Sequence, residues 1–250
     1  MSGTPLENPI DCRNCPVRRM ALFSPMDETQ LEAVQGTRRH QELYPTGAAL
    51  YREGKGVTQA YTVFEGWVMR YKTLEDGRRQ IIGYSLPGDF LGFVPLSDCA
   101  VSHSAETLTP TTLCSFNIRD LLEVFPRYPH LALYLCWKCG RDEATAIEHL
   151  TSLGRRPARE RIAHLLLELD YRVRVRNGLP GGEPITLPLT QEHIADTLGL
   201  TSIHVSRTLR TLREDGLLEL KSGRLTFGNR DALVRMTGFQ EQTFHPHPML

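Results

Sequence analysis

The residues best suited to special chemistry in this 250-residue chain are its six cysteines, four of which form two Cys-x-x-Cys pairs. Cys12 and Cys15 lie near the N-terminus, where two thiolates on a short loop can reach one iron-sulfur cluster. Cys136 and Cys139 lie in a segment predicted to be helical, and residues three apart on a helix share a face. We expect packing for this second pair, because a zinc site joining the two pairs would have to bridge more than a hundred residues.

The sequence offers no convincing catalytic set. His103, His130 and His149 are scattered, and no His-Glu-x-x-His motif occurs. The composition, 40% hydrophobic and 23% charged, is typical of globular proteins, and no stretch approaches the roughly 20 apolar residues of a membrane span. The N-terminus lacks a basic and apolar leader, which predicts a cytoplasmic protein with thiols or metal ligands rather than disulfides. We expect a soluble protein that is not an enzyme and does not contact membranes. The rival interpretation is a small-molecule receptor or metalloenzyme.

Charge is unevenly distributed, although the formal net charge of the chain is zero. Residues 155–230 include 13 basic and 9 acidic residues, so this stretch carries +4 and the remainder carries −4. A local positive excess favours contact with a polyanion such as nucleic acid.

The first half of the chain has the pattern of a small β-structure. From about Leu43 to Phe116, short β-branched and aromatic runs alternate with Gly, Pro and Asp, which indicates an antiparallel barrel or sandwich. Asp76-Gly77 predicts a hairpin turn between residues 70–72 and 80–82.

One long helix is predicted from His130 to Leu153, a stretch of about six turns that almost lacks turn residues. Alternating spacings of three and four along it match the seam of a coiled coil between two copies of the chain. The predicted seam consists of Ala132, Leu135, Cys139, Asp142, Ala146, His149 and Leu153. Gly140 and the polar seam members predict a weak interface, which suits regulated dimerisation. The alternative is a helix packed on its own barrel.

A second helix is predicted from Pro157, followed by a Gly- and Pro-rich loop and a short strand at Leu187–Leu189. Residues 190–216, TQEHIADTLGLTSIHVSRTLRTLREDG, then predict two short helices joined by a turn. Thr190 and His193 form a partial capping arrangement for the first, Gly199 ends it, and Thr201 is the N-cap of the second. Val205, Leu209 and Leu212 would be buried, whereas Ser202, His204, Ser206, Arg207 and Arg210 would be exposed.

This pattern fits a helix-turn-helix whose second helix enters the major groove of DNA. Residues 217–220 and 224–227, around the turn Lys221-Ser222-Gly223, predict the two strands of a wing. Arg207 and Arg210 can donate to guanine edges or phosphates, and Thr201 and Ser206 to phosphates. The alternative for each residue is solvated helix surface.

The order of these parts, together with PGDFLGF and QEHIADTLGLTSIHVSRTLRTL, resembles the catabolite activator and fumarate-nitrate regulator (Crp/Fnr) family of bacterial transcription regulators. The resemblance implies an α+β fold with an N-terminal cyclic-nucleotide-binding-type β jelly-roll barrel, a long dimerisation helix and a C-terminal winged helix-turn-helix. It also implies a homodimer, a palindromic site on double-stranded DNA, and contact with RNA polymerase. The expected domains are an arm at 1–26, the barrel at 27–128, the dimerisation helix at 129–154, the DNA-binding domain at 155–230 and a tail at 231–250.

Cyclic AMP is not the expected effector. Family members that bind it carry, after the Gly-Asp-Phe turn, a Glu for the ribose and an Arg-Ser pair for the phosphate. An ungapped count places Phe93 at the Glu position and His103-Ser104 at the Arg-Ser position. The bidentate phosphate contact and the ribose acceptor are thereby lost.

Oxygen-sensing members hold a [4Fe-4S] cluster on three N-terminal cysteines and one remote cysteine. Here Cys12 and Cys15 match two of the first group, and Cys114 matches the remote ligand. The third N-terminal cysteine is missing, so Cys99, Asp11 or an outside ligand would have to complete the site. The resemblance therefore predicts oxygen or redox sensing through an iron-sulfur cluster on Cys12, Cys15, Cys114 and, less defined, Cys99.

Several alternatives to this sensor stay open. Cys12 and Cys15 would then lie in a mobile arm and Cys114 would be an ordinary buried residue. Zinc, thiol redox chemistry or haem could replace the cluster. A regulator without metal would be controlled by its abundance or by a non-nucleotide ligand in the barrel, near Phe93, Val94 and Leu96.

The recognition helix also departs from the family. Members that recognise a TGA half-site carry a Glu at the position of Ile203, and an alkyl group can contact a thymine methyl but cannot accept from a cytosine amino group. We therefore expect a different half-site, with Arg207 as the main base contact and His204 reaching a neighbouring base. The tail after Gly238 is expected to be flexible.

Overall fold

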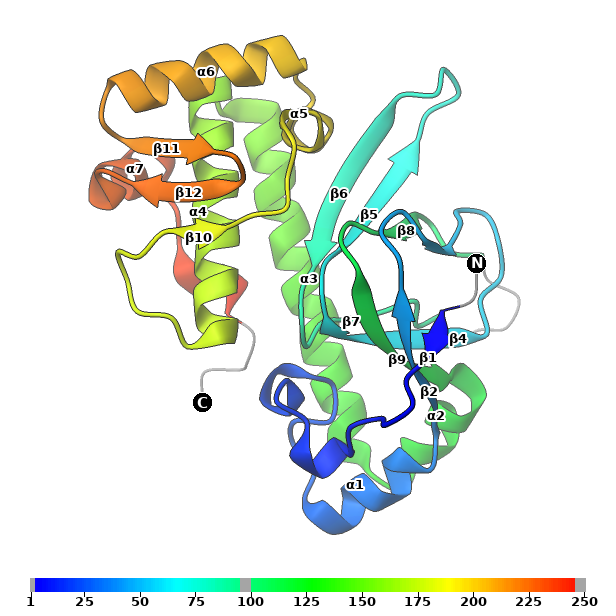
Figure 1. Ribbon diagram of the computed structural model, residues 1–250. Coiled ribbons are helices and arrows are strands. Elements are labelled where there is room, and N and C mark those ends of the chain that lie inside the picture. The colour runs from blue at the N-terminus through cyan, green and yellow to red at the C-terminus, as the bar shows by residue number, and fades with distance from the viewer. Residues whose placement is uncertain (1–2, 95–99, 246–250) are drawn as a thin grey trace. The chain divides into compact units, whose positions relative to one another are not determined.

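The computed structural model describes residues 3–94 and 100–245 (Figure 1). The chain divides into two compact units, Met1–Arg78 with Ile82–Lys138, and Arg79–Ile81 with Cys139–Leu250. Within the described ranges, no helix has the length and apolar character needed to cross a membrane.

Two antiparallel sheets form the barrel of the first unit (Figure 1). One has the order β1 (Thr4–Pro5), β2 (Arg38–Tyr44), β9 (Thr111–Asn117), β4 (Gln59–Glu65) and β7 (Phe90–Leu91). The other has the order β3 (Ala49–Tyr51), β8 (Ser104–Thr107), β5 (Val68–Thr73) and β6 (Arg79–Ser85). The predicted β-structure and its Asp76-Gly77 hairpin are confirmed, since Gly77 has φ +84° between β5 and β6.

The barrel is held by side chains that point inward from both sheets. Val63 on β4, Val68 on β5 and Leu113 on β9 are fully buried in one cluster. β9 is buried at every position but its last, Asn117, whose side chain caps α2 (Ile118–Val124) by accepting from the amide of Arg119. This central strand also carries Cys114, which makes that thiol part of the core.

The N-terminal segment is packed onto the barrel, which contradicts the alternative of a mobile arm. It includes two short 3-10 turns, η1 (Cys12–Asn14) and η2 (Arg18–Met20), and then α1 (Glu28–Gln35), which opens with a capping box between Asp27 and Gln30. The backbone amide of Ile10 donates to Oε1 of Gln41 on β2 at 2.8 Å. Leu22, Met26 and Leu31 are buried in the same cluster as Cys114.

The long helix is α3 (Pro129–Arg155), close to its predicted bounds. The predicted seam is divided between two faces of the helix, since Cys139 and Ala146 are exposed whereas Leu135 and His149 are not. Leu135 packs against the core, and His149 bonds Glu168, so these side chains face their own chain. Among the exposed residues of α3, seven follow one another at alternating spacings of three and four, and we call them the exposed stripe: Leu133, Cys136, Gly140, Glu143, Ile147, Leu150 and Gly154. A shift of one residue rotates a helical face by about 100°.

The second cysteine pair is a further correction. Cys136 and Cys139 were expected to pack, but both are exposed on α3. Cys136 belongs to the exposed stripe, and Cys139 lies beside it.

The second unit continues with α4 (Ala158–Asn177), which follows Pro157 as predicted and ends at Gly178 in the left-handed conformation. β10 (Ile185–Thr186), β12 (Arg224–Phe227) and β11 (Leu218–Lys221) form a small antiparallel sheet. The strand predicted at Leu187–Leu189 is thus displaced, because Pro188 has no amide proton for a ladder. Leu187 and Leu189 are buried all the same.

The C-terminal segment was expected to be flexible after Gly238, and the described part of it is not. α7 (Arg230–Thr237) is followed by η3 (Glu241–Phe244). Phe239 and Phe244 are buried and stack with ring centroids 5.4 Å apart. Both rings contact the imidazole of His164 on α4.

Candidate functional site

Two short helices, α5 (Gln191–Leu198) and α6 (Ser202–Glu214), form the predicted helix-turn-helix. Thr190 caps α5 in a reciprocal capping box with His193, and Gly199 ends it with φ +61°. Thr201 caps α6 by accepting from the amide of His204 at 3.2 Å. The local signals in the sequence therefore place both helix ends correctly.

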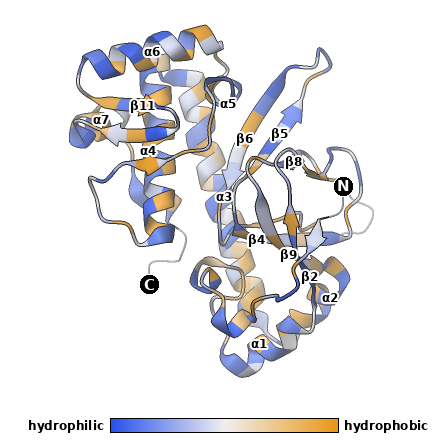
Figure 2. Ribbon diagram, in the orientation of Figure 1, coloured by the Kyte–Doolittle hydropathy of each residue, from blue (hydrophilic) through white to orange (hydrophobic). Residues whose placement is uncertain are grey.

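The two faces of α6 differ as the sequence predicts, and its ribbon alternates between hydrophilic and hydrophobic segments (Figure 2). Val205, Leu209 and Leu212 are buried. The exposed residues are Thr201, Ser202, Ile203, His204, Ser206, Arg207 and Arg210, all of the candidate DNA contacts. Ile203, the apolar member of this set, is 67% exposed.

A surface hollow of about 570 Å³ joins this face to the start of α4. It is lined by Ala158, Arg159, Thr201, Ile203, His204, Arg207, Thr208 and Thr211. The sequence analysis missed Arg159, whose guanidinium pairs with Asp215 at 2.6 Å. Its position two residues after the helix-starting Pro157 was the available signal, because the amides of a first helical turn are free to bind anions.

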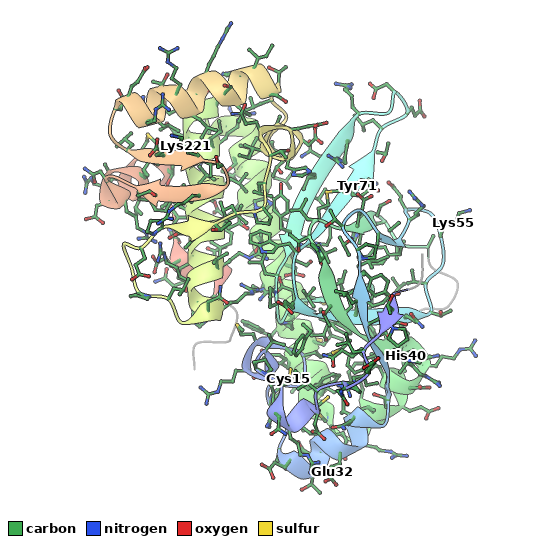
Figure 3. All side chains as sticks on the ribbon, in the orientation of Figure 1. Cys15, Glu32, His40, Lys55, Tyr71 and Lys221 are labelled. Atoms are coloured by element: carbon green, nitrogen blue, oxygen red, sulfur yellow. The ribbon has the colours of Figure 1, made fainter. Side chains whose placement is uncertain are left out.

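The remaining basic residues are arranged around α6. Arg210 pairs with Glu214 at 2.8 Å, and this carboxylate raises the pKa of the guanidinium further above its usual value. Lys221, labelled in Figure 3, and Arg224 lie opposite each other at the tip of the wing. The turn between them has positive φ at Ser222 and Gly223, and a Cβ at Gly223 would lie 2.8 Å from the carbonyl oxygen of Leu187.

The barrel positions of the cyclic-nucleotide site are occupied by internal contacts. Nε2 of His103 lies 3.1 Å from the hydroxyl of Tyr51, and burial lowers the pKa of His103 to about 4. A neutral imidazole at pH 7 cannot replace an arginine at a phosphate. Oγ of Ser104 accepts from the amide of Glu53, and the ring of Phe93 packs between Phe90 and Phe125. Phe93 is therefore partly buried and packs against the core.

Three cysteines from distant parts of the sequence meet at the base of the barrel; we call Cys12, Cys15 and Cys114 the cysteine cluster. Cys12 packs against the buried group that contains Cys114, and a negative charge on Cys12 or Cys15 would raise the pKa of Cys114. Cys15 is labelled on the N-terminal segment in Figure 3. The described residues thus bring together three of the four proposed metal ligands, while Cys99 lies outside them.

Arg38 on β2 is the cation of the cysteine cluster, and the sequence analysis did not identify it. The positive charge of its guanidinium favours a lower pKa for all three thiols. Its Nη1 also donates to the carbonyl oxygen of Ile10 at 2.5 Å. No local signal marks it, because the contact depends on how the N-terminal segment folds back on the sheet.

Burial dominates the acid-base chemistry of these thiols. It raises the pKa of Cys114 to about 12 and also raises the pKa values of Cys12 and Cys15, although Arg38 opposes the shift. All three are therefore protonated at neutral pH, and protonated thiols are poor nucleophiles.

A barrel domain, a long helix and a winged helix-turn-helix define a transcription regulator of the two-domain bacterial type. Family models agree: a cyclic nucleotide-binding domain matches residues 41–128, and a Crp-like helix-turn-helix domain matches residues 160–236. The chain belongs to the Crp/Fnr family of transcription regulators. Members of this family bind DNA through the helix-turn-helix and function as dimers, and the relatives are regulators rather than enzymes.

Individual relatives support this assignment. The chain is 34% identical to the nitrogen fixation regulation protein FixK of Bradyrhizobium diazoefficiens, over 85% of this chain and 87% of that one. It is 31% identical to the transcriptional activator protein FnrL of Cereibacter sphaeroides, over 85% and 86% of the two chains. The structure of FixK2 from Bradyrhizobium japonicum superposes with a TM-score of 0.70 at 30% identity, covering 78% of this chain and 96% of that one.

Proposed function

We propose that this DNA-binding regulator responds to oxygen or redox state, and that the cysteine cluster ligates an iron-sulfur cluster. The observation that carries the proposal is the convergence of Cys12 and Cys15 with Cys114, about a hundred residues away in sequence. Soft thiolate donors on a short loop and one strand suit iron-sulfur chemistry. We also propose a cytoplasmic location, where its DNA is found.

The donor set fits an iron-sulfur group in chemical type, since it supplies three thiols and leaves one position for a fourth ligand. Cys99 is the candidate for that position. Asp11 is less suited, because its carboxylate already accepts from Arg13 and Gln35. Within residues 3–94 and 100–245, no three ligating side chains lie at metal-binding spacing, so ligation requires a rearrangement of the loop that carries Cys12 and Cys15. Once bound, an iron-sulfur cluster supplies an oxygen-sensitive redox centre.

The raised pKa values favour this proposal over a simple thiol switch at the same residues. Protonated, buried thiols react slowly with oxidants, whereas metal ligation removes the proton outright. Without a bound cluster, Cys12 and Cys15 would have the packed arrangement seen here. The turn that carries Cys12 contacts α1, so a change in ligation would alter how the N-terminal segment packs.

At the DNA end, we propose that α6 inserts into the major groove of a palindromic duplex as part of a homodimer. Two recognition helices must then lie about 34 Å apart. Arg207 donates to a base edge, Ile203 contacts a thymine methyl, and Arg159 at the rim of the hollow contacts phosphate. RNA polymerase is the proposed protein partner. We also propose the domain bounds given above, except that α7 and η3, largely within the expected tail at 231–250, pack on α4 and are assigned to the DNA-binding domain.

Anaerobic purification tests the sensor. We expect absorbance at about 400 nm with bound iron and sulfide, lost on exposure to air. Cys114→Ala should abolish both, and Cys139→Ser is the matched control that should retain them. Binding to an operator duplex should differ between anaerobic and aerated protein. A colourless, iron-free protein that binds its operator equally under both conditions would contradict the proposal and favour the regulator without metal.

A further inference from the structure

One face of α3 carries apolar side chains directed at solvent. Leu133, Ile147 and Leu150 are 71%, 55% and 68% exposed. Together with Cys136, Gly140, Glu143 and Gly154 they form the exposed stripe, whose members are separated by three and four residues in strict alternation. This alternation is the a and d spacing of a heptad repeat, with Leu133, Gly140, Ile147 and Gly154 at a and Cys136, Glu143 and Leu150 at d.

The occupant of such a stripe is a second copy of this chain. Regulators of the family function as dimers, and a heptad face is complementary to itself. Its one fully apolar heptad has the β-branched Ile147 at a and Leu150 at d, the combination that favours two parallel strands. Parallel helices in register are also what a twofold DNA site requires.

We propose that Cys136 lies opposite Cys136 of the second copy in this seam, and that oxidation joins the two thiols in an intersubunit disulfide that locks the dimer. Packed helices are about 8–10 Å apart, and their Cα atoms lie about 2.3 Å from each axis. Facing Cα atoms can therefore approach to about 3.4–5.4 Å, a range that overlaps the separation of about 4.4–6.8 Å found in disulfides. The proposal rests on dimeric DNA binding and is independent of the iron-sulfur cluster.

The seam is weak enough for such a bond to matter. Gly140 and Gly154 contribute no apolar side chain, and Glu143 would face the same carboxylate of the second copy. A covalent tether makes reassociation intramolecular, with an effective concentration in the millimolar range, about 10⁻³ M. Oxidised protein therefore stays dimeric at dilutions where the reduced protein dissociates.

Cys139 provides a matched control because it is exposed on the same helix three residues away. In this register it occupies a flanking g position, and g residues of parallel helices face e residues rather than each other. The two thiols thus differ in their partner across the seam although both are open to solvent.

The test treats the full-length protein with diamide and measures covalent dimer by non-reducing electrophoresis and intact mass. Each disulfide formed releases two protons and two electrons, which reduce the N=N bond of diamide to the hydrazine. We expect a dithiothreitol-reversible dimer in wild type and in Cys139→Ser, and at least a tenfold lower yield in Cys136→Ser. Ile147→Glu, which keeps both cysteines but breaks the seam, should lower the yield similarly and give a monomer in sedimentation.

Undiminished cross-linking in Cys136→Ser, or its loss in Cys139→Ser, would overturn the thiol assignment. A dimeric Ile147→Glu variant would overturn the register of the seam. The iron content of reduced Cys136→Ser should equal that of wild type, so a failure of the iron-sulfur proposal shows in a different measurement.

Discussion

Nε2 of His149 on α3 lies 2.7 Å from Oε2 of Glu168 on α4, and this contact joins the long helix to the DNA-binding domain within the second unit. The side chain of Glu168 is 1% exposed, and its other oxygen accepts from Arg172 at 3.0 Å. Burial alone would raise the pKa of Glu168, but His149 and Arg172 outweigh it and lower the pKa to about 2. The carboxylate is therefore a buried anion held by two partners.

Removing this carboxylate should destabilise the second unit. In Glu168→Gln, His149 and Arg172 keep their buried positions but lose the anion, and breaking a buried pair typically costs about 3–5 kcal/mol. We expect a clearly lower urea midpoint for the unfolding of this unit. The unfolding is monitored by far-UV circular dichroism. Glu75→Gln, at an exposed hairpin position, is the control and should leave the midpoint unchanged. An unchanged midpoint in Glu168→Gln would mean that the pair does not stabilise the helix junction.

The buried imidazole of His164 should make the second unit less stable in mild acid. Burial between Phe239 and Phe244, with Arg156 nearby, lowers the pKa of His164 from 6.5 to about 4. The unfolded state therefore binds the proton more readily between these pH values, so stability falls as pH drops from about 6.5 to about 4. The melting temperature should fall over this window in wild type and less steeply in His164→Gln. Equal slopes in both proteins would assign the acid sensitivity to other groups.

The sequence predicts those parts of the fold and of the candidate sites that depend on interactions between neighbouring residues. Thr190, Gly199 and Thr201 act on backbone groups within four residues, so they fix the helix-turn-helix without tertiary information. The orientation of α3 is different, because two adjacent stripes of that helix are partly apolar. Contacts with distant residues, such as the bond from His149 to Glu168 and the packing of Leu135 on the core, determine which one faces inward. Arg38 and the packed N-terminal segment depend on contacts between distant residues, which a local pattern does not encode.

Replacing Ile203 on the recognition helix α6 should change the DNA half-site that the protein prefers. Ile203 is exposed beside Arg207 in the hollow at the start of α6. Ile203→Glu would introduce a carboxylate that accepts from a cytosine amino group, and one good base contact discriminates by about 1–3 kcal/mol. We expect the selected half-site to change at one base pair, with roughly a tenfold or greater shift between matched duplexes. Arg207→Ala should weaken all duplexes, and Arg119→Ala on α2 should weaken none.

The thiol of Cys114 should be protected from alkylation in the folded protein. Its pKa near 12 lowers the thiolate fraction about a thousandfold relative to an ordinary thiol at the same pH, and burial adds steric protection. In metal-free protein at pH 8, iodoacetamide should modify Cys114 roughly a hundredfold more slowly than it does after unfolding in urea. Peptide mass spectrometry measures the two rates. Rapid labelling of Cys114 in the folded protein would show that the N-terminal segment does not cover it.

Phe244 tests whether the C-terminal segment belongs to the DNA-binding domain. Its ring is buried against Phe239 and His164, although polar residues surround it in sequence. Truncating a buried aromatic ring to alanine costs about 3–5 kcal/mol, because the transfer free energy is lost and a cavity remains. Phe244→Ala should therefore lower the urea midpoint of the second unit and weaken operator binding at temperatures near its melting point. Gln242→Ala, an exposed neighbour, should do neither, and equal stability of the two variants would mean that the segment does not support the domain in solution.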